Sequence, residues 1–195
     1  GRLLGPLAGS LPSAVRHRLV ELVYSTLTPR ALVNVDAWFE QLLPSVARLT
    51  SMQRERGVIL SRLGDVLSLQ GDLAGVLQTH RHALAIRETL VRSDTTNEDW
   101  QFDLGISHER VGAALFALGD MFGAFQAFLA KLVIIERLVQ TDKKNLRWQR
   151  DLSVSHEKLG NVQLAKGDLP GALQTYRVAL AIIERLVQLD TTNVG

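Results

Sequence analysis

Five histidines are the first residues to consider for metal binding or acid–base catalysis: His17, His80, His82, His108 and His156. His80 and His82 flank Arg81 on one predicted helix and point to different faces, so they are poor metal ligands together. His17 has no partner nearby in the sequence. The histidines therefore predict no metal site.

Two triplets contain the residue types of a nucleophilic triad, Ser107-His108-Glu109 and Ser155-His156-Glu157. Adjacent residues on a helix point about 100° apart, so these side chains cannot converge into a relay. His108 shares an apolar stripe with Leu104 and Val111, which favours a packing role with one local hydrogen bond.

Two further patterns could indicate chemistry, and both have simpler interpretations. The glycine-rich pieces GDLAG and GDMFG lack the Lys-Ser/Thr of a phosphate-binding loop. Glu88, Glu136 and Glu184 recur at the same position of a repeated unit, whereas an active site needs carboxylates in unequal roles at one place. We interpret them as helix-surface contacts or braces between helices. The sequence predicts no catalytic residue, no cofactor and no enzyme activity.

The elements that carry these residues repeat every 48 positions, in units of about 52–99, 100–147 and 148–195. Aligned positions include Gly64, Gly112 and Gly160, then Gly71, Gly119 and Gly167. A fixed period over three copies is typical of a stacked repeat, whose units bury their apolar faces against their neighbours.

The pattern of apolar and turn residues in each unit predicts two helices. The first ends near the second of these glycines, which suits a left-handed cap, and Asp72, Asp120 and Asp168 then cap the second helix. The second helix stops at an Asp-x-x-Asn cluster, at 94–97, 142–145 and 190–193. The glycines at 64, 112 and 160 mark a close approach of the two helices.

The two ends of the chain differ from the repeats. Residues 1–50 show no 48-residue echo and predict an N-terminal helical cap or docking segment, and residues 51–195 form the repeat domain. The last second helix carries Leu180, Ile183, Leu186 and Val187 without a following unit to cover them. We expect either self-association through this uncapped repeat or a longer array.

At Leu159-Gly160, Ala172, Tyr176 and Ala179 the pattern resembles the tetratricopeptide repeat (TPR) family. The closest resemblance is to long-unit bacterial repeats that open with W-Q-x-D-L-x-x-S-H-x-K-L-G, although the 48-residue unit is longer than the family's usual one and Val76, His80 and Lys131 depart from its motif. The resemblance implies an all-α, right-handed α-solenoid of three helical hairpins with an N-terminal helical segment. It also implies that the first helices line a concave peptide-binding groove.

A spacing of +3, +4, +3 along the first helices gives the positions of that groove, and a basic residue lies beside them in each unit. The spacing selects Val58, Ser61, Asp65 and Ser68, then Ile106, Glu109, Ala113 and Phe116, then Val154, Glu157, Asn161 and Leu164. The candidate binding residues are Arg62, Asp65, Ile106, Glu109, Arg110, Phe116, Val154, Glu157, Lys158, Asn161 and Leu164. Arg62, Arg110 and Lys158 form a basic ladder, whose alternative interpretation is neutralisation of Glu109 and Glu157 on an ordinary solvated face. Relatives that grip a C-terminal carboxylate use lysine where this chain has Ser61, Glu109 and Glu157, so we expect no such clamp.

Composition limits the other classes of function. The net charge is +2 and the pI about 9.2, which suggests a helical-repeat nucleic-acid binder as the alternative, although Asp65, Glu109 and Glu157 in the groove disfavour it. Cysteine is absent and no apolar run is long enough to span a bilayer. We expect a cytoplasmic protein-binding scaffold, either alone or as one arm of a larger signalling or assembly protein.

Overall fold

The chain is all-helical wherever its structure is described. The computed structural model describes residues 50–192, and no strand occurs among them. The helices are α4 (Thr50–Leu69), α5 (Leu73–Ser93), α6 (Glu98–Ala117), α7 (Met121–Thr141), α8 (Leu146–Ala165) and α9 (Leu169–Thr192). The all-α prediction is confirmed for this range. The predicted N-terminal segment falls outside the described residues, apart from Thr50.

Three identical turns join α4 to α5, α6 to α7 and α8 to α9. Gly71, Gly119 and Gly167 adopt φ values of 78°, 83° and 79°, in the left-handed region that favours glycine. Asp72, Asp120 and Asp168 accept hydrogen bonds from the backbone N–H three residues later, at 2.9, 2.8 and 3.0 Å. The predicted glycine caps and aspartate caps are both confirmed.

A second kind of turn joins α5 to α6 and α7 to α8. Asn97 and Asn145 cap the following helix by accepting from the backbone N–H of Trp100 and Trp148, at 3.0 and 3.2 Å. The side-chain amides of Gln101 and Gln149 donate back to the carbonyls of Thr95 and Lys143. The repeated Trp-Gln pair thus fixes the entry of each new unit.

The third Asp-x-x-Asn cluster behaves differently from the prediction. Helices α5 and α7 end just before Asp94 and Asp142, whereas α9 continues through Asp190 to Thr192. The first two aspartates accept from the backbone N–H of residues 96 and 144 within a turn that leads into another capped helix. In α5 and α7 the aspartate thus ends the helix as part of a hydrogen-bonded turn.

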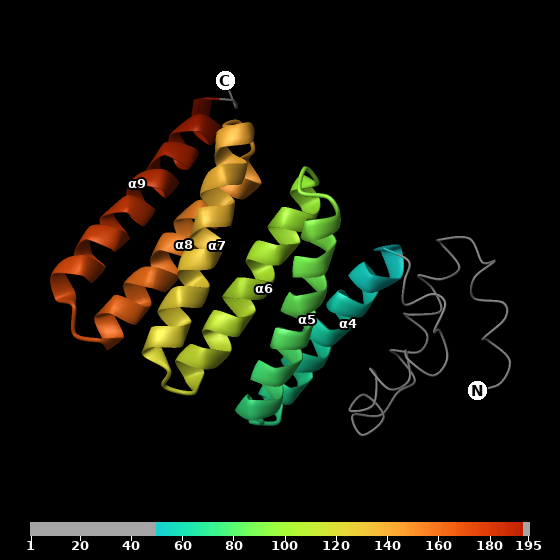
Figure 1. Cartoon of the computed structure of the whole chain (residues 1–195). Helices are drawn as coiled ribbons and strands as arrows, with labels where there is room; N and C mark the ends of the chain where they lie inside the picture. Colours follow the sequence, from blue (N-terminus) through green and yellow to red (C-terminus); the bar gives the residue numbers. More distant parts are fainter. Residues whose placement is uncertain (1–49, 193–195) are drawn as a thin grey trace, which may run out of the picture.

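Each helix packs on the next one in the chain, so α4 to α9 lie in order across the molecule (Figure 1). The predicted close approach at the aligned glycines is confirmed. A Cβ built on Gly112 would lie 2.7 Å from the Phe128 ring, and one built on Gly160 would lie 2.8 Å from the Tyr176 ring. An aromatic ring of the second helix thus sits directly on the backbone of the first.

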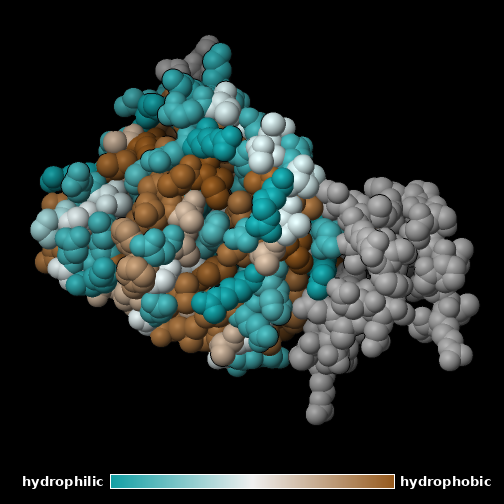
Figure 2. Space-filling model, in the orientation of Figure 1, coloured by the Kyte–Doolittle hydropathy of each residue, from teal (hydrophilic) through white to brown (hydrophobic). Residues whose placement is uncertain are grey.

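The buried core continues from α6 through α7 to α8. One buried cluster joins Val111 and Leu115 of α6, Phe128 and Leu132 of α7, and Leu159 of α8. A neighbouring cluster joins Phe102, Ile135, Leu138, Val139 and Trp148. Neighbouring helices therefore share buried residues. Figure 2 shows that apolar side chains also form patches on the surface, between polar ones.

Candidate binding surface and its polar contacts

The surface formed by the outward sides of α4, α6 and α8, here the first-helix surface, carries most of the predicted binding residues. Val58, Ile106 and Val154 occupy the same place in the three helices, and each has an apolar, β-branched side chain. Val58 is 39% exposed, while Ile106 and Val154 are half-buried. The column thus places an apolar side chain at the same position of every first helix, and Ile106 also packs against the buried cluster that contains Phe102 and Trp148.

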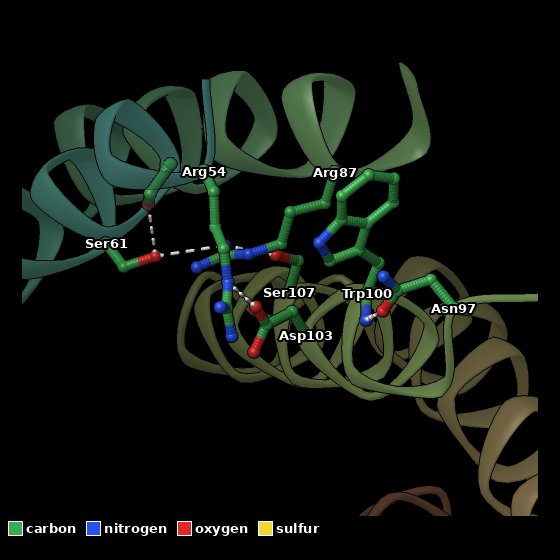
Figure 3. Close-up of polar contacts among 8 residues, drawn as sticks. Arg54, Ser61, Arg87, Asn97, Trp100, Asp103 and Ser107 are labelled. Atoms are coloured by element: carbon green, nitrogen blue, oxygen red, sulfur yellow. Dashed lines mark hydrogen bonds and ion pairs between the residues drawn. The ribbon is translucent and has the colours of Figure 1, made fainter. Parts of the chain in front are cut away.

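Between the first two helix pairs, Arg87 of α5 forms a buried polar contact that sequence reasoning missed (Figure 3). Its Nη1 donates to Ser61 Oγ of α4 at 3.2 Å and to Ser107 Oγ of α6. Nearby, Arg54 Nε donates to Asp103 Oδ2 at 3.0 Å. Burial lowers the pKa of Arg87, and Asp103 opposes that shift. The hydroxyl groups of Ser61 and Ser107 therefore both accept hydrogen bonds from Arg87 within the protein.

Between the second and third helix pairs, Lys131 of α7 takes the corresponding role. Its side chain is fully buried, and its ammonium group contacts Glu109 Oε2 of α6 and Asp151 Oδ1 of α8, the latter at 3.2 Å. Lys131 stands where the other two units have Ala83 and Ala179. Glu109, predicted to line the groove, is therefore held by a buried cation.

Two members of the predicted basic ladder lie close to carboxylates. Arg110 pairs with Asp65, and Lys158 lies 3.9 Å from its neighbour Glu157. Arg62 is exposed. The neutralising interpretation thus holds for Lys158, whereas Arg110 uses an acid of α4 because Lys131 takes Glu109.

The remaining predicted residues divide between core and surface. Asn161 Oδ1 accepts from the Tyr176 hydroxyl at 2.6 Å, which ties α8 to α9. Phe116 is half-buried against the core cluster of α6, α7 and α8, and Leu164 is half-exposed. Two of the positions compared with a carboxylate clamp, Ser61 and Glu109, are turned to internal partners.

Two hollows bear on binding. One of about 430 Å³ lies on the first-helix surface and is lined by Leu146, Arg147, Arg150, Asp151 and Val154. A larger one of about 1180 Å³ lies among α7, α8 and α9, with Val139, Leu152, Val178 and Ile182 among its lining residues. The first combines Leu146 and Val154 with two arginines and with Asp151, whose carboxylate is already paired with Lys131. This lining suits an apolar side chain carried on an acidic partner.

The two repeated histidines interact electrostatically with glutamates of the preceding second helix. Burial lowers the pKa of His108 and of His156, and Glu88 and Glu136 respectively oppose that shift. Ser107 contacts Arg87 and Glu109 contacts Lys131, so the side chains of the Ser107-His108-Glu109 triplet are directed to different partners. Within residues 50–192 no group of three acidic or histidine side chains could hold a metal ion.

His80 occupies the place of Phe128 and Tyr176, with its ring against Gly64. It is buried, and its Nδ1 has no hydrogen-bond partner among the described residues. Burial, together with Arg110, lowers the pKa of His80 from 6.5 to about 4. The folded chain therefore holds this imidazole neutral.

Replacing His80 with the phenylalanine of the second unit should flatten the pH dependence of stability. The folded-state pKa of His80 is below its unfolded value. The stability that depends on neutral His80 is therefore fully present above pH 6.5 and is lost as the pH falls toward 4. At pH 5 this loss is about 1–2 kcal/mol. Urea unfolding of wild type and His80→Phe at pH 7.5 and pH 5 measures it, and equal losses in both proteins would contradict the assignment.

No protein-family model matches the chain, and no curated protein matches it. None of helices α4 to α9 combines the length and the apolar character that crossing a membrane requires. The inference of function therefore depends on the surface itself.

Proposed function

We propose that this chain is a non-catalytic scaffold that binds a protein or peptide along the first-helix surface. In this proposal α4–α5, α6–α7 and α8–α9 are three TPR-like hairpins of a right-handed α-solenoid, of the long-unit bacterial type. Identical glycine turns and the aromatic-on-glycine contact within each pair support the hairpins. A cytoplasmic, cysteine-free adaptor within a larger assembly fits the composition.

The observation that carries the proposal is the hollow beside Val154. All of its lining residues belong to α8, where Val154, the α8 member of the apolar column, lies beside Arg147 and Arg150. An apolar recess with cations beside it favours a segment that places one large apolar residue next to carboxylates. The internally paired residues Arg110, Glu109 and Asn161 then serve to hold the surface in shape.

Selection from a library of random twelve-residue peptides displayed on phage tests the proposal, with the full chain immobilised. We expect enrichment of peptides that combine an aromatic or aliphatic residue with Asp or Glu. Binding of the selected peptides should fall at least tenfold with Arg150→Glu/Val154→Glu. Arg150 and Val154 lie next to residues that hold the fold but make none of the buried polar contacts themselves.

The matched control is Arg177→Glu, which changes the same charge on an exposed arginine of α9. It should leave peptide binding within about twofold, because Arg177 lies on a second helix. Enriched peptides that bind the double variant and wild type equally well would remove the first-helix surface from the proposal.

A further inference from the structure

One apolar face of α9 lacks the cover that the same face has on α7. On α7, Leu132, Ile135 and Val139 are 8%, 0% and 9% exposed, and they share buried clusters with Leu159 and Trp148 of α8. The same positions on α9 are Leu180, Ile183 and Val187, and these are 57%, 38% and 57% exposed. The described helices therefore leave an apolar stripe exposed on α9. The equivalent stripe on α7 is covered by a helix, α8.

The polar groups beside this stripe indicate which side chains a helix docked on it should carry. Glu88 of α5 and Glu136 of α7 act on His108 of α6 and His156 of α8, respectively. Glu184 stands at the same position on α9 and is exposed. A helix docked there in the manner of α8 would bring a histidine opposite Glu184.

A second polar position excludes one kind of helix. Asp151 of α8 is acceptable on α7 because buried Lys131 pairs with it at 3.2 Å. On α9 the residue in the place of Lys131 is Ala179, and Ile183 replaces the cation Arg87 of α5. A carboxylate at the Asp151 position would thus be desolvated against α9 without a partner, which is costly.

We propose that the face of Leu180, Ile183, Glu184 and Val187 binds an amphipathic helix of the α8 kind, with a histidine opposite Glu184 and an apolar residue in place of Asp151. A second copy of the chain fits less well. Its α6 and α8 already pack on α5 and α7, and its α4 carries Leu60 at the histidine position and Glu55 at that of Asp151. This face is separate from the first-helix surface, so either proposal can fail alone.

A labelled peptide with the sequence of α8, residues 146–165, and the substitution Asp151→Leu tests the site by fluorescence anisotropy with the full chain. We expect this substituted peptide to bind at least tenfold more tightly than the peptide that keeps Asp151. Changing its His156 to Ala should weaken binding about threefold, and Glu184→Gln in the protein should abolish that difference. This coupling would not arise from nonspecific apolar contact.

Val187→Glu in the protein should weaken binding at least tenfold. Val133→Glu is its control, because Val133 of α7 is 58% exposed, as much as Val187. Equal loss with both variants, or equal affinity for the peptides with and without the Asp151→Leu substitution, would overturn the proposal. Sedimentation of the chain alone tests whether a second copy of the chain occupies this face. A dimer that Val187→Glu dissociates, and that the peptide does not displace, would also overturn the proposal.

Isolated helices of about 20 residues are only marginally stable, so the same helix is also joined after Asn193, in place of Val194-Gly195. This repeats the Asn145–Leu146 junction of the preceding unit. The extension that carries the leucine substitution should raise the Tm by several degrees, and the extension that keeps the aspartate by less. Absence of any rise, together with absence of peptide binding, would reject the site.

Discussion

Lys131→Met should destabilise the chain by about 2–3 kcal/mol, a large loss for a single substitution. Lys131 is fully buried and its ammonium group contacts both Glu109 and Asp151. Methionine fills a similar volume, so the packing changes little while the two carboxylates lose their shared cation. These carboxylates are 26% and 20% exposed, so water solvates them in part and limits the loss.

Urea unfolding at pH 7 measures this loss against two comparison proteins. Lys158→Met removes a cation from a looser, more exposed pair with Glu157, and should cost less than about 1 kcal/mol. The triple variant Lys131→Met/Glu109→Gln/Asp151→Asn removes all three charges and should recover more than half of the single variant's loss. A triple variant as unstable as the sum of its parts would show that the charges are not coupled.

The buried cations also show where prediction from the sequence stops. Each occupies a column that is otherwise apolar: Lys131 aligns with Ala83 and Ala179, and Arg87 aligns with Ile135 and Ile183. Such a departure from an apolar column is a usable signal for a buried polar contact. It cannot identify the partners, because Ser61, Ser107, Glu109 and Asp151 come from other helices and meet the cation only through the packing of those helices.

The local turns were predictable because their causes are local. A glycine at positive φ followed by a capping aspartate needs only a few consecutive residues, as at Gly71 to Gly75. The exception is Asp190, which does not end α9 although it belongs to the same repeated cluster as Asp94 and Asp142.

The sequence could assign candidate residues to the first helices but could not give the contacts of their side chains. The spacing placed Arg110, Glu109 and Asn161 on the first helices, yet all three form contacts with other helices. Long side chains at the edge of a helix face can turn toward a neighbour as readily as toward solvent, and spacing alone does not distinguish the two. The β-branched column of Val58, Ile106 and Val154 has no such choice, which makes it the firmer basis for a binding proposal.

The second large effect is expected at the glycines on which aromatic rings rest. Gly112→Ala should destabilise the chain by about 2 kcal/mol, because its new methyl group would lie 2.7 Å from Phe128 Cε1, in a ring that is buried and cannot move aside. Gly105→Ala on the same helix is the control, since its methyl group would meet Ile134 at 3.6 Å, an ordinary contact. There the better helix propensity of alanine should stabilise the chain by about 0.5–1 kcal/mol.

The opposite signs of these two changes make the comparison informative, because both add one methyl group to α6. Thermal and urea unfolding of the two variants measure them, and equal destabilisation would mean that the ring does not limit the helix approach at Gly112. Phe128→Leu adds a second check. By vacating space beside Gly112, it should make Gly112→Ala nearly neutral in the double variant, although Phe128→Leu alone costs about 1–2 kcal/mol. The helices α6 and α7 share a buried cluster with α8. The packing of Phe128 on Gly112 therefore also helps to position α8, which carries the residues that line the hollow at Val154.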